Sequence, residues 1–174
     1  MVRIHPVSPM IILGIDPGTA TIGFGLIKTT KKNFSLVNFG WIETNKNEIW
    51  GKRLIIIHKE ITSLIKNHKP DVLALERLFF AANVKTAMTV SEAIGVMRLA
   101  ATRAKVPVVE YVPMQVKMEI CGSGKADKNQ VKKEIRKLLS FRSPNRKKTH
   151  FDDVCDALAV AICHARKTCG KIFI

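Results

Sequence analysis

Four carboxylates occupy positions from which this sequence can carry out metal-assisted chemistry. Asp16 and Glu76 each end a run of apolar residues, and Asp153 and Asp156 open a third apolar segment. A carboxylate at the end of a buried element costs free energy unless another group compensates its charge. Carboxylate oxygens are the ligands that Mg²⁺ prefers, and two such ions about 4 Å apart can promote hydrolysis of a phosphodiester. The four acids therefore predict a two-metal nuclease site.

Each acid also has a simpler interpretation. Asp16 can be a turn residue, and Glu76 can form an ion pair at the surface. Either Asp152 or Asp153 can cap a helix, and the spacing does not exclude Asp152 from the site, since it stands four residues before Asp156. The metal-site interpretation is favoured because all of these acids would otherwise have to be incidental in the same strand order.

The charge of the chain indicates the kind of partner. The 174 residues include 29 Lys and Arg against 14 Asp and Glu, a formal net charge of +15. Such an imbalance favours a nucleic-acid partner, while the alternative is a surface tuned for solubility. Acids clustered within a basic chain fit a nuclease, in which the basic surface holds the phosphate backbone.

Length and hydropathy predict one globular domain. Hydrophobic residues make up 47% of the chain, and no apolar run reaches the roughly 18 residues that cross a bilayer. The apolar run that ends at Asp16 is too short for a secretory signal. We therefore expect no membrane association and a cytoplasmic protein. Residues 1–9 contain Pro6 and Pro9 and are predicted to form a disordered extension, with the nuclease domain at residues 10–174.

The elements that must position the acids alternate in a recognisable order. Three apolar or alternating runs joined by short connections predict an antiparallel meander. Helical and strand patterns then alternate, which predicts parallel strands with helices between them. The sequence thus predicts an α/β chain with the ribonuclease H-like fold, a mixed five-stranded sheet flanked by helices. The expected strands are 11–16, 21–28, 34–43, 71–76 and 106–112, and the better-defined helices are 84–104, one that ends at Leu139, and 151–166.

Basic and aromatic residues near the acids suggest DNA contacts. One face of the helix that ends at Leu139 is basic, and Asp127 and Gln130 have capping-box spacing at its start. A basic loop, residues 142–150, precedes the last acids. Phe79 and Phe80 follow Glu76, where one of them can stack on an unpaired base and the other can pack in the core. The predicted basic DNA contacts are Lys125, Lys128, Lys132 and, in the loop, Arg146.

These motifs together resemble those of the RuvC-type Holliday junction resolvases. The resemblance runs from about residue 11 to residue 166. It implies a homodimer that uses two Mg²⁺ ions per site, with Mn²⁺ as a substitute, to nick two opposed strands of a four-way DNA junction. It also implies a branch-migration motor of the RuvAB type as a partner. The segments that carry it are Ile12–Thr19, Leu75–Phe79, Val116–Lys117 with Ala126–Val131, and Asp153–Ala159.

The resemblance also assigns roles to individual positions. The acidic positions of the family fall on Asp16, Glu76, Asp153 and Asp156, so the resemblance, and not the spacing, selects Asp153 over Asp152. The aromatic residue that contacts the junction falls on Phe79, and two further functional lysines fall on Lys117 and Lys128.

Three other functions are compatible with parts of the pattern. Residues 14–19 also resemble the first phosphate-binding turn of actin-like and sugar-kinase ATPases, but those proteins need two such domains and the chain has room for one. A nuclease of the same fold that cuts another branched DNA is a second alternative. A junction-binding protein that does not cut is the third.

Overall fold

The computed structural model describes residues 9–30, 33–77, 84–140 and 150–169, and its centre is a mixed five-stranded sheet. The strand order is β3-β2-β1-β4-β5. Strands β1 to β3 form an antiparallel meander, whereas β4 pairs parallel with both β1 and β5. The strands are β1 (Ile11–Asp16), β2 (Thr21–Thr29), β3 (Phe34–Glu43), β4 (Val72–Glu76) and β5 (Val108–Tyr111).

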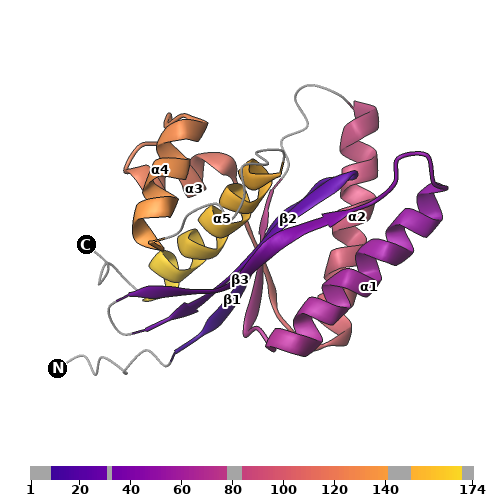
Figure 1. Ribbon diagram of the computed structural model, residues 1–174, viewed down its shortest axis with the longest axis horizontal. Coiled ribbons are helices and arrows are strands. Elements are labelled where there is room, and N and C mark those ends of the chain that lie inside the picture. The colour runs from indigo at the N-terminus through magenta and orange to yellow at the C-terminus, as the bar shows by residue number, and fades with distance from the viewer. Residues whose placement is uncertain (1–8, 31–32, 78–83, 141–149, 170–174) are drawn as a thin grey trace.

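Helices cover both faces of the sheet (Figure 1). Helices α1 and α2 lie on one face, and α5 lies against the other with α3 and α4 outside it. Neighbouring residues of β1 point to opposite faces, so that Ile12 belongs to the core under α5 and Leu13 to the core under α1 and α2. The helices are α1 (Trp50–His68), α2 (Val84–Arg103), α3 (Pro113–Cys121), α4 (Lys128–Leu138) and α5 (Phe151–Cys169).

The predicted mixed sheet and its order of elements are confirmed, with shifted bounds. The fifth strand is shorter than the predicted 106–112, because Val106 and Pro107 belong to the connection from α2. The last helix extends beyond the predicted Arg166, to Cys169. Asp153 lies in the first turn of α5, and Asp156 follows in the next turn.

The small residues of α2 divide between two environments. Ala93, Ala100 and Ala101 are buried in the core against the sheet, which is ordinary packing. Gly95 is exposed, and a Cβ placed on it would meet no atom within 4 Å. The small residues of α2 therefore lie on two faces of the helix, one packed on the sheet and one exposed.

The described helices do not include one that is long and apolar enough to cross a membrane. The disordered extension predicted at residues 1–9 falls almost wholly outside the described residues and stays a prediction.

Candidate active site

Two of the four predicted acids lie at the ends of adjacent parallel strands. In the β1–β4 register Ile15 pairs with Leu75. Asp16 and Glu76, the next residue of each strand, therefore lie at the same edge of the sheet. The residues that precede these acids, from Ile12 in β1 and from Val72 in β4, are all buried. The apolar runs thus bury the strands, and the end of each run places a carboxylate at the boundary of the core.

The other two acids reach the same edge because α5 packs directly on the backbone of the sheet. Gly14 of β1 pairs with Gly25 of β2, and Asp16 pairs with Gly23. A Cβ on Gly14 would overlap the carbonyl oxygen of Ala157, and one on Gly23 would overlap that of Asp153. The absence of side chains at these glycines allows the first turns of α5 to approach Asp16.

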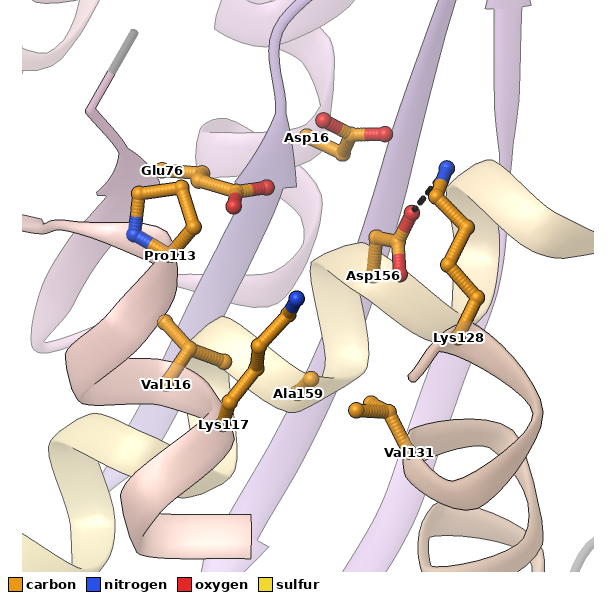
Figure 2. Close-up of a pocket in the computed structure, with 9 residues that line it drawn as sticks. All are labelled: Asp16, Glu76, Pro113, Val116, Lys117, Lys128, Val131, Asp156 and Ala159. Atoms are coloured by element: carbon orange, nitrogen blue, oxygen red, sulfur yellow. Dashed lines mark ion pairs between the residues drawn. The ribbon is translucent and has the colours of Figure 1, made fainter. Parts of the chain in front are cut away.

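Three of the carboxylates line a single cavity of about 270 Å³. Figure 2 shows the side chains of Asp16, Glu76 and Asp156 pointing toward one another, with the ammonium groups of Lys117 and Lys128 beside them. The apolar part of the lining comes from Pro113, Val116, Val131 and Ala159. The cavity therefore combines acids from three elements with lysines from two others.

Burial and mutual repulsion raise the pKa values of these acids. The pKa of Asp16 rises to about 8, first because of burial and then because of the charges of Asp156, Glu76 and Asp153. The pKa of Glu76 rises to about 7, with burial as the main cause and Asp156 as the next. Burial also raises the pKa values of Asp153 and Asp156. Such a cluster favours the uptake of positive charge, as protons or as a cation.

Lys128 is held at the cavity by the start of α4. Asp127 caps this helix by accepting the N–H of Gln130 at 2.9 Å, and the side chain of Gln130 accepts the N–H of Asp127 at 2.9 Å. This predicted capping box fixes Lys128 as the first helical residue, and its Nζ lies 3.6 Å from Oδ2 of Asp156. The charge of Asp156 raises the pKa of Lys128, which keeps this lysine protonated.

Lys117 approaches the cavity from α3, on the other side. This helix begins with Pro113, separated from β5 only by the N-cap residue Val112, so Lys117 follows one turn into the helix. Its positive charge lowers the pKa of Glu76, against the larger effect of burial.

The adjacent acids Asp152 and Asp153 face different partners. Oδ1 of Asp152 lies 2.5 Å from Nζ of Lys132 on α4. Asp153 does not line the cavity, but its charge raises the pKa values of both Asp16 and Asp156. Asp153 is therefore electrostatically part of the cluster. Asp152 also raises the pKa of Asp156, but it does not act on Asp16 and it forms an ion pair between α5 and α4.

The donor set fits a hard divalent cation. Carboxylate oxygens suit Mg²⁺ and Mn²⁺, and the raised pKa values show that the cluster stabilises added positive charge. Within the described ranges, no group of three or more His, Cys, Asp or Glu side chains already has the spacing of a metal site. Three of the acids thus line one cavity, and coordination of one ion by all three requires their side chains to move.

The predicted DNA-binding residues are distributed around this cavity. Lys117 and Lys128 line it, whereas Lys125 lines a second hollow between α3 and α4. Lys132 is engaged with Asp152, which was not foreseen. Phe79 and Arg146 lie outside the described residues, as does Phe80.

Several residues of the site were missed in the sequence. The glycines at positions 23 and 25 alternate along a strand, a pattern that indicates the close approach of another backbone, and the predicted site did not include them. The apolar lining from Val116 and Val131 gave no signal beyond its helical spacing.

Comparisons with known proteins agree with this architecture. Residues 12–164 match the family model of the crossover junction endodeoxyribonuclease RuvC. RuvC of Clostridioides difficile is 44% identical over 156 residues, covering 90% of each protein, and RuvC of Rubrobacter xylanophilus is 47% identical over 160 residues, covering 91% of this chain and 86% of that one.

A solved structure of Thermus thermophilus RuvC in complex with a Holliday junction substrate superimposes with a TM-score of 0.83 at 32% identity, covering 91% of this chain and 94% of that one. This likeness confirms the ribonuclease H-like fold. Because the family model and relatives above 40% identity both span most of the sequence, the chain belongs to the RuvC family of crossover junction endodeoxyribonucleases.

Proposed function

We propose that this protein resolves four-way DNA junctions by paired symmetric nicks, with Asp16, Glu76, Asp153 and Asp156 as the ligands of two Mg²⁺ ions. Enzymes of this family are DNA endonucleases that depend on a divalent metal. Mn²⁺, which accepts the same oxygen ligands, would substitute for Mg²⁺. When bound, such ions activate a water as the nucleophile and stabilise the leaving 3′ oxygen, which gives a 5′-phosphate and a 3′-hydroxyl.

The observation that supports this proposal best is the convergence of three acids in one cavity. Asp16, Glu76 and Asp156 come from two strands and a helix. Burial raises the pKa of each, and the charge of Asp156 further raises the pKa values of Asp16 and Glu76. A carboxylate cluster of this kind destabilises the fold unless it binds positive charge. Cation binding at the reaction centre accounts for a cluster of carboxylates in a chain that is otherwise basic.

The lysines of the cavity would hold the DNA. Lys128 has a largely exposed side chain, 73%, and its ammonium group already lies at Asp156. Both it and Lys117 can donate hydrogen bonds to the oxygens of the scissile phosphate and stabilise the charge that develops on them. Lys125, outside the cavity, would contact a phosphate farther along the strand. The proposals for Phe79 and Arg146 rest on the sequence alone.

Paired nicks require two active sites, so the proposal includes a homodimer. The exposed face of α2 carries Met88 and Leu99, whose side chains are 62% and 51% exposed, on either side of Gly95. Small and apolar residues on one exposed helix face allow a second helix to approach closely. The RuvAB-type branch-migration motor and the cytoplasmic location follow only from the family resemblance and from the expected function.

The first experiment compares substrates. The purified protein is incubated with Mg²⁺ and a synthetic four-way junction, a linear duplex or a flap of the same sequence. We expect paired symmetric nicks in the junction alone, with no cutting in EDTA or by the Asp16→Asn variant, which should still bind the junction.

Other outcomes would change the proposal in defined ways. Cutting of the flap in preference to the junction would keep the metal-dependent nuclease and overturn junction selectivity. Binding without cutting in both Mg²⁺ and Mn²⁺ would indicate a junction-binding protein. Loss of binding in Asp16→Asn would make that residue structural.

A further inference from the structure

A chain of polar contacts connects the edge strand β3 to the start of α5. The indole N–H of Trp41 donates to Oε1 of Glu43 at 3.0 Å, and Nε2 of His150 lies 2.9 Å from the same oxygen. The other ring nitrogen of His150, Nδ1, lies 3.8 Å from Oδ2 of Asp153. The rings of Trp41 and His150 are also in contact, with centroids 5.4 Å apart and tilted by 42°.

His150 stands at the N-terminal boundary of the helix that carries two of the proposed ligands. Its carbonyl accepts the N–H of Val154 at 3.3 Å, which makes it the N-cap residue of α5. Histidine is not a preferred N-cap, because Ser, Thr, Asp and Asn cap helices better. Its side chain is instead used between two carboxylates, one on the edge strand and one at the reaction centre.

The sheet register brings this contact chain beside the cavity. Trp41 of β3 pairs with Gly23 of β2, which in turn pairs with Asp16 of β1. One row of paired residues therefore runs across the sheet from the edge strand to Asp16. The carboxylate of Asp153 lies outside the lining of the cavity and therefore lacks the neighbours that orient Asp156. His150 lies beside Asp153, and its interaction lowers the pKa of that acid against the larger effect of burial.

We propose that His150 is a positioning residue, which orients the carboxylate of Asp153 toward the metal cluster and is itself held in place by Glu43 and Trp41. This inference rests on the proposed function, in which Asp153 is a metal ligand. Groups that hydrogen-bond to or orient a metal ligand restrict its rotamers, and their removal costs about 10- to 100-fold in metal affinity or activity. The distance of 3.8 Å is longer than a hydrogen bond, so the lower end of this range is expected.

The test separates positioning from helix capping. His150→Ala removes the ring and with it the contacts to Glu43 and Asp153. His150→Asn supplies a preferred N-cap whose side chain is too short to bridge those two carboxylates. Glu43→Gln weakens the anchor of the ring without altering α5. Glu48→Gln is the matched control, because it removes the charge of one carboxylate outside this contact chain; among the described residues, that carboxylate pairs with Lys52 at 3.3 Å and accepts the N–H of Ile49 at 3.3 Å.

Two measurements are made on the full chain. Mn²⁺ binding without DNA is followed by calorimetry, and cleavage of the four-way junction is followed in single turnover with enzyme in excess. We expect both His150 variants to bind Mn²⁺ about 10-fold more weakly and to cleave about 10-fold more slowly. The junction dissociation constant in EDTA and the melting temperature of His150→Asn should match those of the parent protein.

The anchor residue gives a second test. Glu43→Gln should also lower the Mn²⁺ affinity and the cleavage rate, but by a smaller factor than the His150 variants. Glu48→Gln should change neither the affinity nor the rate. The double variant Glu43→Gln/His150→Ala should cleave within about 2-fold of His150→Ala alone, because Glu43 acts through the ring.

Three results would overturn the inference. Full activity in His150→Asn would reduce the residue to a helix cap, unchanged Mn²⁺ affinity in His150→Ala would show that the contact orients nothing, and additive losses in the double variant would separate Glu43 from His150. Asp153→Asn is measured in parallel. If that variant still cleaves, the assignment of Asp153 as a ligand fails, and this failure is distinct from one at His150.

Discussion

The two faces of the sheet are covered in different ways. Under α1 and α2 the space is filled by large buried side chains such as Ile57, Ile61 and Met97. Under α5 the sheet presents Gly14 and Gly23, and the helix lies against their backbone. The first face holds its helices at a distance set by side chains, and the second brings its helix as close as the backbone allows.

Because of this difference, we expect the α1 and α2 face to contribute mainly to stability and the α5 face to set the positions of the acids. We expect that the core under α1 and α2 can be repacked without a large change in the position of an acid. On the α5 face, a shift of the helix moves Asp153 and Asp156 relative to Asp16. The same face also carries the buried carboxylates with raised pKa values, which oppose folding unless they bind a proton or a cation.

The largest effect on activity is expected from Asp156→Asn, on the α5 face. This change keeps the shape of the side chain but removes a charged oxygen from the cavity. We expect junction cleavage to fall by about 1,000-fold or more, since a lost metal contact costs several kcal/mol and each 1.36 kcal/mol is tenfold in rate. Single-turnover cleavage and junction binding in EDTA check this. A variant that cleaves within tenfold of the parent would remove Asp156 from the site.

The counterpart on the opposite face is Ile61→Ala, a fully buried residue of α1. The cavity that it leaves should lower the free energy of unfolding by about 2–5 kcal/mol. Cleavage by the folded protein should be unchanged at a temperature well below its transition. Urea denaturation and single-turnover cleavage test the two statements separately. A specific loss of cleavage in the folded state would show that the two faces are coupled.

Gly14→Ala tests the close approach of α5. Its Cβ would overlap the carbonyl oxygen of Ala157, so the helix must move away from β1. Overpacking of this kind costs about 1–3 kcal/mol, and here the displacement should also reduce cleavage by the folded protein. Gly51→Ala is the control, because a Cβ there meets no atom within 4 Å. Unaltered cleavage in a folded Gly14→Ala variant would show that the site tolerates movement of α5.

The last prediction concerns stability alone, namely its dependence on pH in EDTA. The pKa of Asp16 rises from 3.8 to about 8 on folding, so the folded state binds more protons than the unfolded state in this interval. Protonation of Asp16 therefore contributes fully to the free energy of unfolding below about pH 4, and this contribution is lost as the pH rises through 8. The melting temperature should decline over this range, by roughly 2–4 °C per kcal/mol lost.

Asp16→Asn is the matched variant for this dependence. It should flatten the decline and melt higher than the parent at pH 8 in EDTA. Addition of Mn²⁺ should raise the melting temperature of the parent more than that of the variant. A parent protein whose stability rises from pH 4 to pH 8 would contradict the electrostatic description of the cavity.

Much of the fold was predictable because its signals are local. The apolar runs that end at Asp16 and Glu76 specify buried strands, and Asp127 with Gln130 specifies the start of α4. The order of these elements was enough for the mixed sheet. The bounds of β5 were less predictable, because the apolar residues around Val106 pack against the core without joining the ladder.

The details of the site were less predictable because they depend on contacts between distant segments. Spacing could not choose between Asp152 and Asp153, whereas the structure pairs Asp152 with Lys132 and places Asp153 beside His150. The basic face of α4 predicted DNA contacts for Lys128 and Lys132, but Lys132 is engaged in that ion pair. The contact of His150 with Glu43 spans more than 100 positions of the sequence, and no local pattern announces it.

The sequence by itself determined the strands, the helices and the acids at their ends, because hydrophobic periodicity and helix capping act between residues close in the chain. It also determined the family, through motifs that retain both residue type and order. Only the tertiary structure decided which acids share a cavity, how far each pKa rises, and which lysine and histidine face them. These properties depend on distances of a few ångströms across the sheet, and the glycines under α5 set those distances by allowing helix and backbone to touch.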